Sequence, residues 1–237
     1  MTMGELRHEA ASLGLTLSDP QIAAFTRYQD LLRLWNRRLN LTSIDDAEVI
    51  RQRHFLDSLT CAVATGDLDA QSLIDVGSGG GFPGLPLKIL FPGVQLTLVE
   101  SVTKKVRFLK AVVEALALTG VQIVDARAET IGQDEAFRTR YDWAVARAVA
   151  PLNILLEYLL PLCRIGGNAL AMKSARAPAE IDGAADAIST LGGGEPRLHQ
   201  VRLPGRSDPS YLVVIPKLAP TPQVYPRRPG IPAKRPL

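Results

Sequence analysis

One short segment constrains the fold more than any other, because a run of apolar residues passes directly into a loop rich in glycine. It reads Leu73-Ile-Asp-Val-Gly-Ser-Gly-Gly-Gly-Phe-Pro-Gly84, with five glycines in its last eight residues. Glycine lets a backbone approach a ligand closely, and a helix that begins after such a loop points its first amides at that ligand. The segment predicts a strand, a tight turn and a helix, with a cofactor site at the turn.

Short apolar segments alternate with amphipathic ones from Ser72 onward, which is typical of βαβ units and a mostly parallel sheet. The loop Pro204–Pro209 is too short for a crossover helix, so the strands on its two sides are predicted to be antiparallel. The fold class is therefore α/β, with a mostly parallel seven-stranded sheet and an antiparallel last strand. The predicted strands are Leu73–Val76, Leu96–Val99, Gln122–Val124, Trp143–Val145, Ala169–Met172, Leu198–Leu203 and Tyr211–Ile215.

The chain divides into three segments. Residues 1–66 read as a helical cap, because Ser18-Asp19-Pro20 offers capping side chains and apolar residues then recur every three or four positions. A second amphipathic helix is predicted within the cap, from about Asp46 to Ala64, with Val49, Leu56, Leu59 and Val63 on its apolar side. Residues 67–216 hold the sheet. Residues 217–237 are rich in proline and are predicted to form an extended, poorly packed tail.

Charge is distributed unevenly along the chain. The 237 residues include 27 Lys and Arg against 24 Asp and Glu, which gives a formal net charge of +3. Five of the basic residues and no acidic residue lie between Pro216 and Leu237, so the rest of the chain carries a charge of −2. An anionic partner is therefore expected to contact local clusters of basic residues and the tail, because the body has no excess of positive charge.

Several classes of protein are excluded by what the sequence lacks. It contains no apolar run of about 18 residues, and its first residues lack the apolar stretch of a signal peptide. We therefore expect a cytoplasmic protein that does not bind to a membrane. Its two cysteines, Cys61 and Cys163, have no His neighbours at ligand spacing, so neither a metal site nor a disulfide is expected.

The spacing of the glycines distinguishes between cofactors. A P-loop is excluded because no Gly-Lys-Ser or Gly-Lys-Thr follows, and the frame Gly77-x-Gly79-x-Gly81 has Phe82 where a dinucleotide fingerprint has its third glycine. Glu100 ends the next predicted strand, where a carboxylate can accept hydrogen bonds from both hydroxyls of a ribose. These features indicate a cofactor of the adenosine type, with a ribose and without phosphates.

Asp75-Val-Gly-Ser-Gly-Gly-Gly81 together with Glu100 resembles the S-adenosylmethionine (SAM) site of Rossmann-like class I methyltransferases. Further motifs extend the likeness over nearly the whole chain, and with them the sequence resembles the bacterial small-subunit rRNA methyltransferase family RsmG, also called GidB. These motifs are Trp35-Asn36…Asn40-Leu41-Thr42, Arg53-His-Phe-Leu-Asp-Ser58, Gly81-Phe-Pro-Gly84, Ala128-Glu129, Arg147-Ala148 and the basic tail.

The resemblance implies a definite reaction. It implies transfer of a methyl group from SAM to N7 of one guanine in the decoding-region loop of 16S rRNA. The implied partner is 16S rRNA, the 30S subunit or its assembly intermediate, with the chain acting as a monomer and without a protein partner. The residues implied to bind the cofactor are Gly77, Gly79, Phe82, Glu100, Ala128, Glu129 and Arg147.

Motifs for other methylation chemistries are missing. Methylation of an exocyclic amine typically uses Asn/Asp-Pro-Pro-Tyr/Phe after the fourth strand, where this chain reads Ala146-Arg-Ala-Val-Ala-Pro151. Cytosine C5 chemistry needs an activated cysteine, and Cys163 follows Leu162 at a predicted helix end. Guanine N7 carries an exposed lone pair and loses no proton, so proximity and in-line alignment suffice without a general base. The missing motifs are consistent with N7 as the target.

No residue is expected to be an obligatory catalytic group, and three side chains are candidates for positioning. His54 and Asp57 stand three residues apart on a predicted helix and so share a face, either as a packing contact or to position RNA. Arg147 follows a central strand and needs an anionic partner, for which the SAM carboxylate, Glu129 and an RNA phosphate are candidates.

RNA contacts are expected from clusters of basic residues. Lys104 and Lys105 stand at the start of a helix, where cations are disfavoured by the helix dipole, so they form either a solvated face or a phosphate track. The tail is expected to fold back toward the ligand-binding edge of the sheet and border the RNA site. The predicted RNA contacts are Arg51, Arg53, Lys104, Lys105, Arg227, Arg228, Lys234 and Arg235.

Two other functions are weighed against this one, namely a nicotinamide-dependent oxidoreductase on a similar sheet and a non-catalytic RNA-binding protein with a vestigial cofactor loop. Phe82 in place of a glycine disfavours the oxidoreductase. The joint presence of Gly77, Gly79, Glu100 and Arg147 disfavours the vestigial loop.

Overall fold

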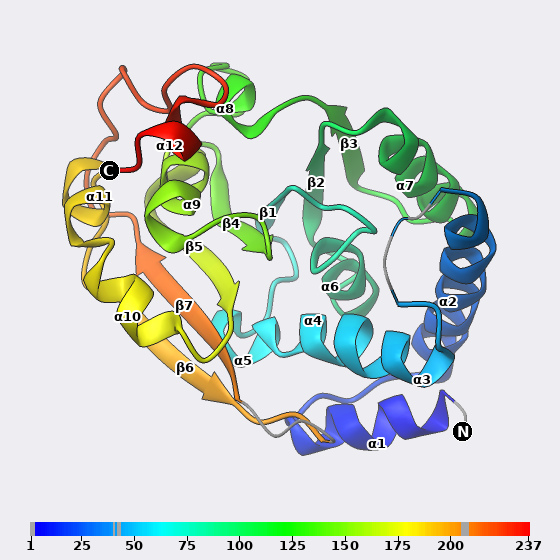
Figure 1. The fold of residues 1–237 in the computed structure, drawn as a ribbon. Helices are drawn as coiled ribbons and strands as arrows, with labels where there is room; N and C mark the ends of the chain where they lie inside the picture. The colour runs from blue at the N-terminus through cyan, green and yellow to red at the C-terminus, as the bar shows by residue number, and fades with distance from the viewer. Residues whose placement is uncertain (1–2, 40, 42–43, 205–208) are drawn as a thin grey trace.

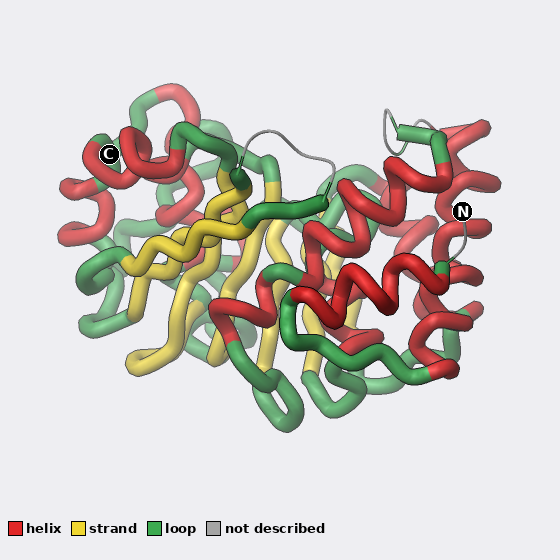
Figure 2. The backbone as a smooth tube through the Cα atoms, turned by 90° about the horizontal axis from the view of Figure 1, so that it is seen from below, coloured by secondary structure: helices red, strands yellow, loops and turns green. Residues whose placement is uncertain are grey.

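The computed structural model describes residues 3–39, 41, 44–204 and 209–237 (Figure 1). Two segments discussed above therefore lie partly outside the described residues, namely the Asn40-Leu41-Thr42 motif and the Pro204–Pro209 loop. Helices flank the sheet on both sides, with the N-terminus among the helices on one side and the C-terminus among those on the other (Figure 2).

A seven-stranded sheet of order β3-β2-β1-β4-β5-β7-β6 forms the centre of the molecule. Strands β1 to β5 are mutually parallel, whereas β7 runs antiparallel to both β5 and β6. The predicted α/β fold class and all seven predicted strands are confirmed. The strands are β1 (Ser72–Val76), β2 (Gln95–Glu100), β3 (Val121–Asp125), β4 (Tyr141–Arg147), β5 (Cys163–Lys173), β6 (Arg197–Val201) and β7 (Ser210–Pro216).

The core consists of two apolar clusters, one on each face of the sheet. Since both faces of the central strands are covered, these strands are apolar along nearly their whole length. Among the described residues, no helix is long and apolar enough to cross a membrane. The helices that connect the strands are α6 (Gly84–Leu90), α7 (Thr103–Ala115), α8 (Ala128–Ile131), α9 (Leu152–Leu159), α10 (Ala177–Asp182) and α11 (Ala185–Thr190).

The N-terminal cap shares its core with α6 and α7. Phe25, Tyr28 and Leu32 form the buried face of the long second helix, and the ring of Phe55 lies 5.1 Å from that of Phe25. The helices of the cap are α1 (Gly4–Ser12), α2 (Asp19–Leu39), α3 (Ala47–Ile50), the π-helical segment η1 (Arg51–Leu56), α4 (Asp57–Leu59) and α5 (Cys61–Thr65).

The π-helical segment η1 corrects the predicted second amphipathic helix. Leu56 and Leu59 are buried as expected, but Val63 is 46% exposed, and Ile50 is fully buried while Val49 is only partly covered. A π-turn holds more residues than an α-turn, so it shifts the side chains on either side of it to different faces. Residues spaced for an α-helix of 3.6 residues per turn therefore do not share one face across this segment.

The expectation of a poorly packed tail is wrong. The tail contains α12 (Ile231–Lys234), which lies beside α9 (Figure 1). Proline has no N–H, so this segment cannot pair its backbone in a regular sheet. Instead the guanidinium of Arg138 donates hydrogen bonds to the carbonyl oxygens of Thr221, Pro222 and Tyr225. Buried side-chain donors thus hold the tail against the body.

Candidate active site

A cavity of about 170 Å³ lies at the carboxyl ends of β1, β2 and β3, and we call it the first cavity. Ligands of open α/β sheets bind at this edge. Four of the seven predicted cofactor residues line the first cavity, namely Gly77, Glu100, Ala128 and Glu129.

Glu100 connects the glycine loop to the segment before α7. Its Oε2 accepts a hydrogen bond from the Gly79 N–H at 2.9 Å, and its Oε1 accepts from the N–H groups of Ser101 and Val102 at 2.8 Å. A carboxylate offers about four acceptor positions, so the group can still accept a hydrogen bond from a ribose hydroxyl. Gly79 thus supports the site through Glu100 and does not line the first cavity itself.

Residue 77 has to be a glycine for two reasons. Its φ is +73°, and a Cβ atom there would lie 2.8 Å from a methyl carbon of Val149. The turn after β1 is therefore packed against the turn after β4. The acceptor chemistry of Glu100 suits a ribose hydroxyl, so Gly77, Glu100, Ala128 and Glu129 are the residues that would contact a SAM ligand at the first cavity.

Arg147 ends β4 and joins the sheet to the cap. Its Nη1 donates to the carbonyl oxygen of Arg53 at 2.9 Å and lies 3.3 Å from Asp57 Oδ2, while its Nη2 lies 3.2 Å from His54 Nδ1. Of the partners proposed for Arg147, Glu129 is not the one observed, because the carboxylate that pairs with Arg147 is Asp57. The SAM carboxylate and an RNA phosphate stay predictions. Arg147 was predicted to bind the cofactor, but it is not among the described residues that line the first cavity.

Phe82 lies in the same cluster rather than at the first cavity. Its ring stacks on that of His54 at 4.5 Å and on that of Tyr28 at 5.5 Å, and the guanidinium carbon of Arg147 is 4.8 Å from its centre. These contacts join the cap to the glycine loop. The hydroxyl of Tyr28 also donates to the carbonyl oxygen of Gly80 within that loop.

Burial and, to a smaller extent, the positive charge of Arg147 lower the pKa of His54 to about 4. His54 is therefore neutral at pH 7 and has little affinity for a proton. Both side chains contact Arg147, and whether the His54 and Asp57 pair also positions RNA stays a prediction.

A larger cavity of about 750 Å³, the second cavity, lies between the cap, the end of β5 and β7. Four cationic side chains line it, namely Arg53, Arg147, Lys173 and Arg176, together with His54 and Asp57. Lys173 and Arg176 were missed by sequence reasoning. Both lie at or just after the carboxyl end of β5. Open α/β sheets bind ligands at the carboxyl ends of their strands, and this rule, which identified Glu100, also applies to Lys173 and Arg176.

The two cavities share one wall, the segment from Arg147 to Val149. Arg147 and Ala148 line the second cavity, and Val149 lines the first. Ala148 has a φ of +53°, which is costly for a residue with a side chain and is concentrated at functional sites.

The predicted RNA-binding residues occupy different environments. Arg51 is buried and forms ion pairs with Glu5 and Glu9 inside the cap, so it is not available to RNA and that prediction is corrected. Arg53 is exposed at the second cavity. Lys105 Nζ lies 3.9 Å from Glu100 Oε2, which supplies the negative charge that its place at the start of α7 requires. Of the other predicted RNA-binding residues, Arg227 is only partly exposed and pairs with Glu157, and the exposed ones are Lys104, Arg228, Lys234 and Arg235.

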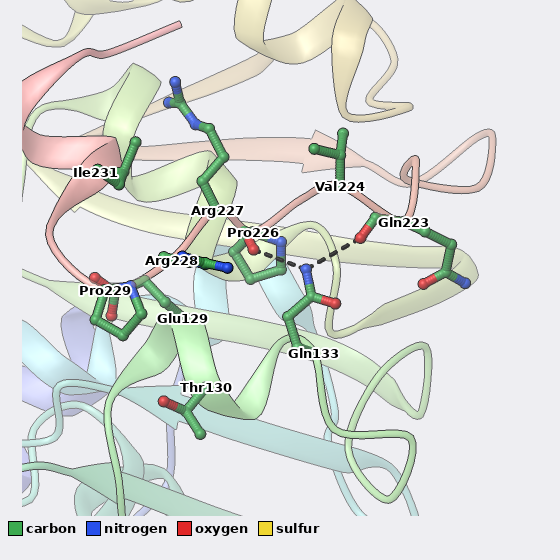
Figure 3. Close-up of a pocket in the computed structure, with 10 residues that line it drawn as sticks. All are labelled: Glu129, Thr130, Gln133, Gln223, Val224, Pro226, Arg227, Arg228, Pro229 and Ile231. Carbon is green, nitrogen blue, oxygen red and sulfur yellow. Dashed lines mark hydrogen bonds between the residues drawn. The ribbon is translucent and has the colours of Figure 1, made fainter.

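The tail meets the cofactor edge of the sheet at Glu129. The Gly230 N–H donates to Glu129 Oε1 at 2.9 Å, so Glu129 stands between the first cavity and the tail. A third cavity of about 520 Å³ lies between the tail and α8, where Gln133 donates to the carbonyl oxygens of Gln223 and Pro226 (Figure 3). The tail thus folds back toward the ligand edge; that it borders bound RNA stays a prediction.

Solved structures share the fold at low sequence identity. A predicted O-methyltransferase from Agrobacterium tumefaciens aligns with a TM-score of 0.54 at 17% identity, over 72% of this chain and 86% of that one. A tRNA methyltransferase from Aquifex aeolicus aligns with a TM-score of 0.53 at 15% identity, over 69% and 68% of the two chains. These likenesses show a class I methyltransferase fold.

Sequence relatives are much closer. A protein of Roseiflexus castenholzii named ribosomal RNA small subunit methyltransferase G is 54% identical over 99% of this chain and 100% of its own length. One of the same name from Alkaliphilus metalliredigens is 43% identical over 98% of this chain and 97% of its own. The GidB family model, described as rRNA small subunit methyltransferase G, matches residues 21–207. The chain with this two-cavity site therefore belongs to the GidB family.

Proposed function

We propose that this chain transfers the methyl group of S-adenosylmethionine to N7 of one guanine in the decoding-region loop of 16S rRNA. The observation that carries the proposal is the wall shared by the two cavities, because Val149 faces the cofactor side and Arg147 faces a cavity rich in cations. Cationic side chains suit RNA phosphates. The proposed substrate is 16S rRNA within the 30S subunit or its assembly intermediate, which places the reaction in the cytoplasm.

The proposed reaction needs no proton acceptor. When bound, the cofactor supplies an electrophilic methyl group on a positively charged sulfur. The lone pair of guanine N7 forms the new bond to that carbon, the electrons of the carbon–sulfur bond return to sulfur, and no proton leaves the base. The protein therefore contributes by holding the reacting atoms close and in line.

The residues at the two cavities support a reaction in which the protein only positions the cofactor and the base. Glu100 holds the ribose, and the contact between Gly77 and Val149 brings the cofactor turn against the wall of the second cavity. His54 is the only imidazole among the described residues at the second cavity, and its pKa of about 4 makes it a poor base. The imidazole is thus a poor base, and methylation at N7 requires none.

Mapping of methyl groups on rRNA tests the proposal. In cells that lack this chain, mass spectrometry is expected to show the loss of one 7-methylguanosine from 16S rRNA, which the wild-type chain restores. Gly77→Ala is expected to abolish restoration, because its Cβ collides with Val149. Gly14→Ala is the matched control, since Gly14 has a similar φ of +77° but open space around it.

Gly14→Ala carries the same backbone strain and is expected to restore the modification. An unchanged 7-methylguanosine content in cells without the chain contradicts the proposal. Assays with naked 16S rRNA, assembly intermediates and complete 30S subunits then identify the form of the substrate.

A further inference from the structure

The second cavity has an unusual balance of charges for a phosphate-binding surface. Four of its side chains are cationic, and Asp57 is the one carboxylate among the described residues that line it. A carboxylate repels phosphate, so its presence among these cations points to a different part of the RNA. The proposed function requires one guanine base to come to the wall shared with the first cavity, so a base has to enter this region.

Asp57 is held in place by neighbours from two other elements. Its Oδ2 accepts from Arg147 at the end of β4, and its Oδ1 lies 3.5 Å from the hydroxyl of Ser210 at the start of β7. Its side chain is only 12% exposed. A group fixed in this way needs little reorganisation when a ligand arrives. Since a carboxylate has about four acceptor positions, it can keep Arg147 and also accept from a base.

We propose that Asp57 selects guanine by accepting hydrogen bonds from its N1–H and its exocyclic amino group. Guanine presents these two donors side by side, and the two oxygens of a carboxylate match them. Adenine, cytosine and uracil offer no such adjacent pair. N7 lies on the opposite side of the purine, so a guanine held by Asp57 turns N7 away from that residue and toward the wall of Ala148 and Val149.

This contact also favours the reaction itself. Methylation of N7 leaves a positive charge on the ring, which makes N1–H and the amino group stronger donors. A carboxylate bound to them is therefore attracted more strongly in the transition state than in the ground state, and only such differential binding raises kcat. Asp57 touches the substrate base and acts on its orientation and on its developing charge.

The inference rests on the proposed function and is tested with two substrates and three proteins. The substrates are 30S subunits reconstituted with 16S rRNA that carries either guanine or inosine at the target position, because inosine lacks only the exocyclic amino group. The proteins are the wild-type chain, Asp57→Asn and the matched control Asp142→Asn. Asp142 is also an ion-paired aspartate, bonded to Arg164, but it lies at the start of β4, on the opposite edge of the sheet.

We expect the wild-type chain and Asp142→Asn to methylate guanine with a kcat/KM about tenfold or more above that for inosine, as for one charged hydrogen bond. Asp57→Asn is expected to bring this ratio to about one or below and to lower kcat on guanine. SAM affinity is expected to stay unchanged. A loss of stability alone would reduce both substrates equally and leave the ratio intact.

An equal rate on guanine and inosine with the wild-type chain overturns the inference even if Asp57→Asn does not fold. A ratio in Asp57→Asn that equals the wild-type ratio overturns it as well. If the wild-type chain binds SAM but methylates neither substrate at N7, the proposed function fails, which distinguishes the two failures.

Discussion

Asp75 is fully buried beneath the glycine loop, where its Oδ2 accepts from the Gly84 N–H at 2.8 Å. Its Oδ1 has no hydrogen-bond partner among the described residues. Burial raises the pKa of Asp75 from 3.8 to about 7, and the hydrogen bond from Gly84 offsets only part of that effect. The fold thus accommodates this carboxyl group more easily in its neutral form.

The pH dependence of stability follows from this shift. Because the folded-state pKa lies above the unfolded value, the contribution of Asp75 to stability falls as the pH rises from about 4 to about 7. Asp75→Asn removes the charge. The Tm of Asp75→Asn minus that of wild type is therefore expected to be larger at pH 8 than at pH 5, by a few degrees. Thermal unfolding followed by circular dichroism checks this.

Asp142 provides a control of opposite sign. Burial would raise its pKa, but hydrogen bonds from Ser72 and Arg164 outweigh burial and lower it. The charged form of Asp142 stabilises the fold at pH values above the unfolded pKa. Asp142→Asn is therefore expected to lower the Tm at pH 8 and to lower it less in acid. The Asp75 prediction fails if both variants shift with pH in the same direction.

Among the elements, the tail differs most from its sequence-based interpretation. Its prolines indicated an extended segment, yet Arg227 forms a two-pronged ion pair with Glu157, whose side chain is 1% exposed. Neighbouring Arg228 is exposed. Local composition cannot reveal such docking, because the groups that hold the tail lie far away in sequence, on α9 and near Arg138.

These two adjacent arginines are expected to behave differently when replaced. Arg227→Ala leaves the buried carboxylate of Glu157 without its partner and is expected to cost about 2 kcal/mol of stability. Arg228→Ala is expected to leave stability unchanged and to weaken RNA binding. Denaturant unfolding and filter binding to 16S rRNA measure the two effects, and equal losses of stability in both variants contradict the assignment.

In the cap and the sheet, too, features that depend on neighbouring residues could be predicted and contacts between distant residues could not. Each strand was predictable because its apolar residues and turn signals are adjacent in sequence, and so was Glu100, from its place after a strand. The pairing of Arg147 with Asp57 was not predictable, since it brings together residues 90 positions apart. Neither was the π-helical segment, because the apolar spacing across it fits an ordinary α-helix and gives no sign of a wider turn.

For the whole molecule, a body with a charge of −2 has to bind RNA through local clusters. Arg53 and Arg176 are exposed at the second cavity, which concentrates positive charge at the carboxyl edge of the sheet. The opposite edge carries Arg140, which is also exposed. We therefore expect the placement of cations, rather than their number, to determine which face RNA contacts.

Salt titrations separate these positions. Arg176→Ala is expected to reduce the log–log slope of RNA affinity against salt concentration by about one unit or less, as for the loss of one phosphate contact. Arg140→Ala is expected to leave the slope unchanged. The result that speaks against this arrangement is an equal change of slope in both variants.

The hydrogen bond from Gly230 to Glu129 has a consequence for amide hydrogen exchange. The Gly230 N–H can exchange with solvent only when this bond opens, because a hydrogen-bonded amide is protected. Its exchange rate therefore reports whether the tail is docked at the Glu129 side of the first cavity.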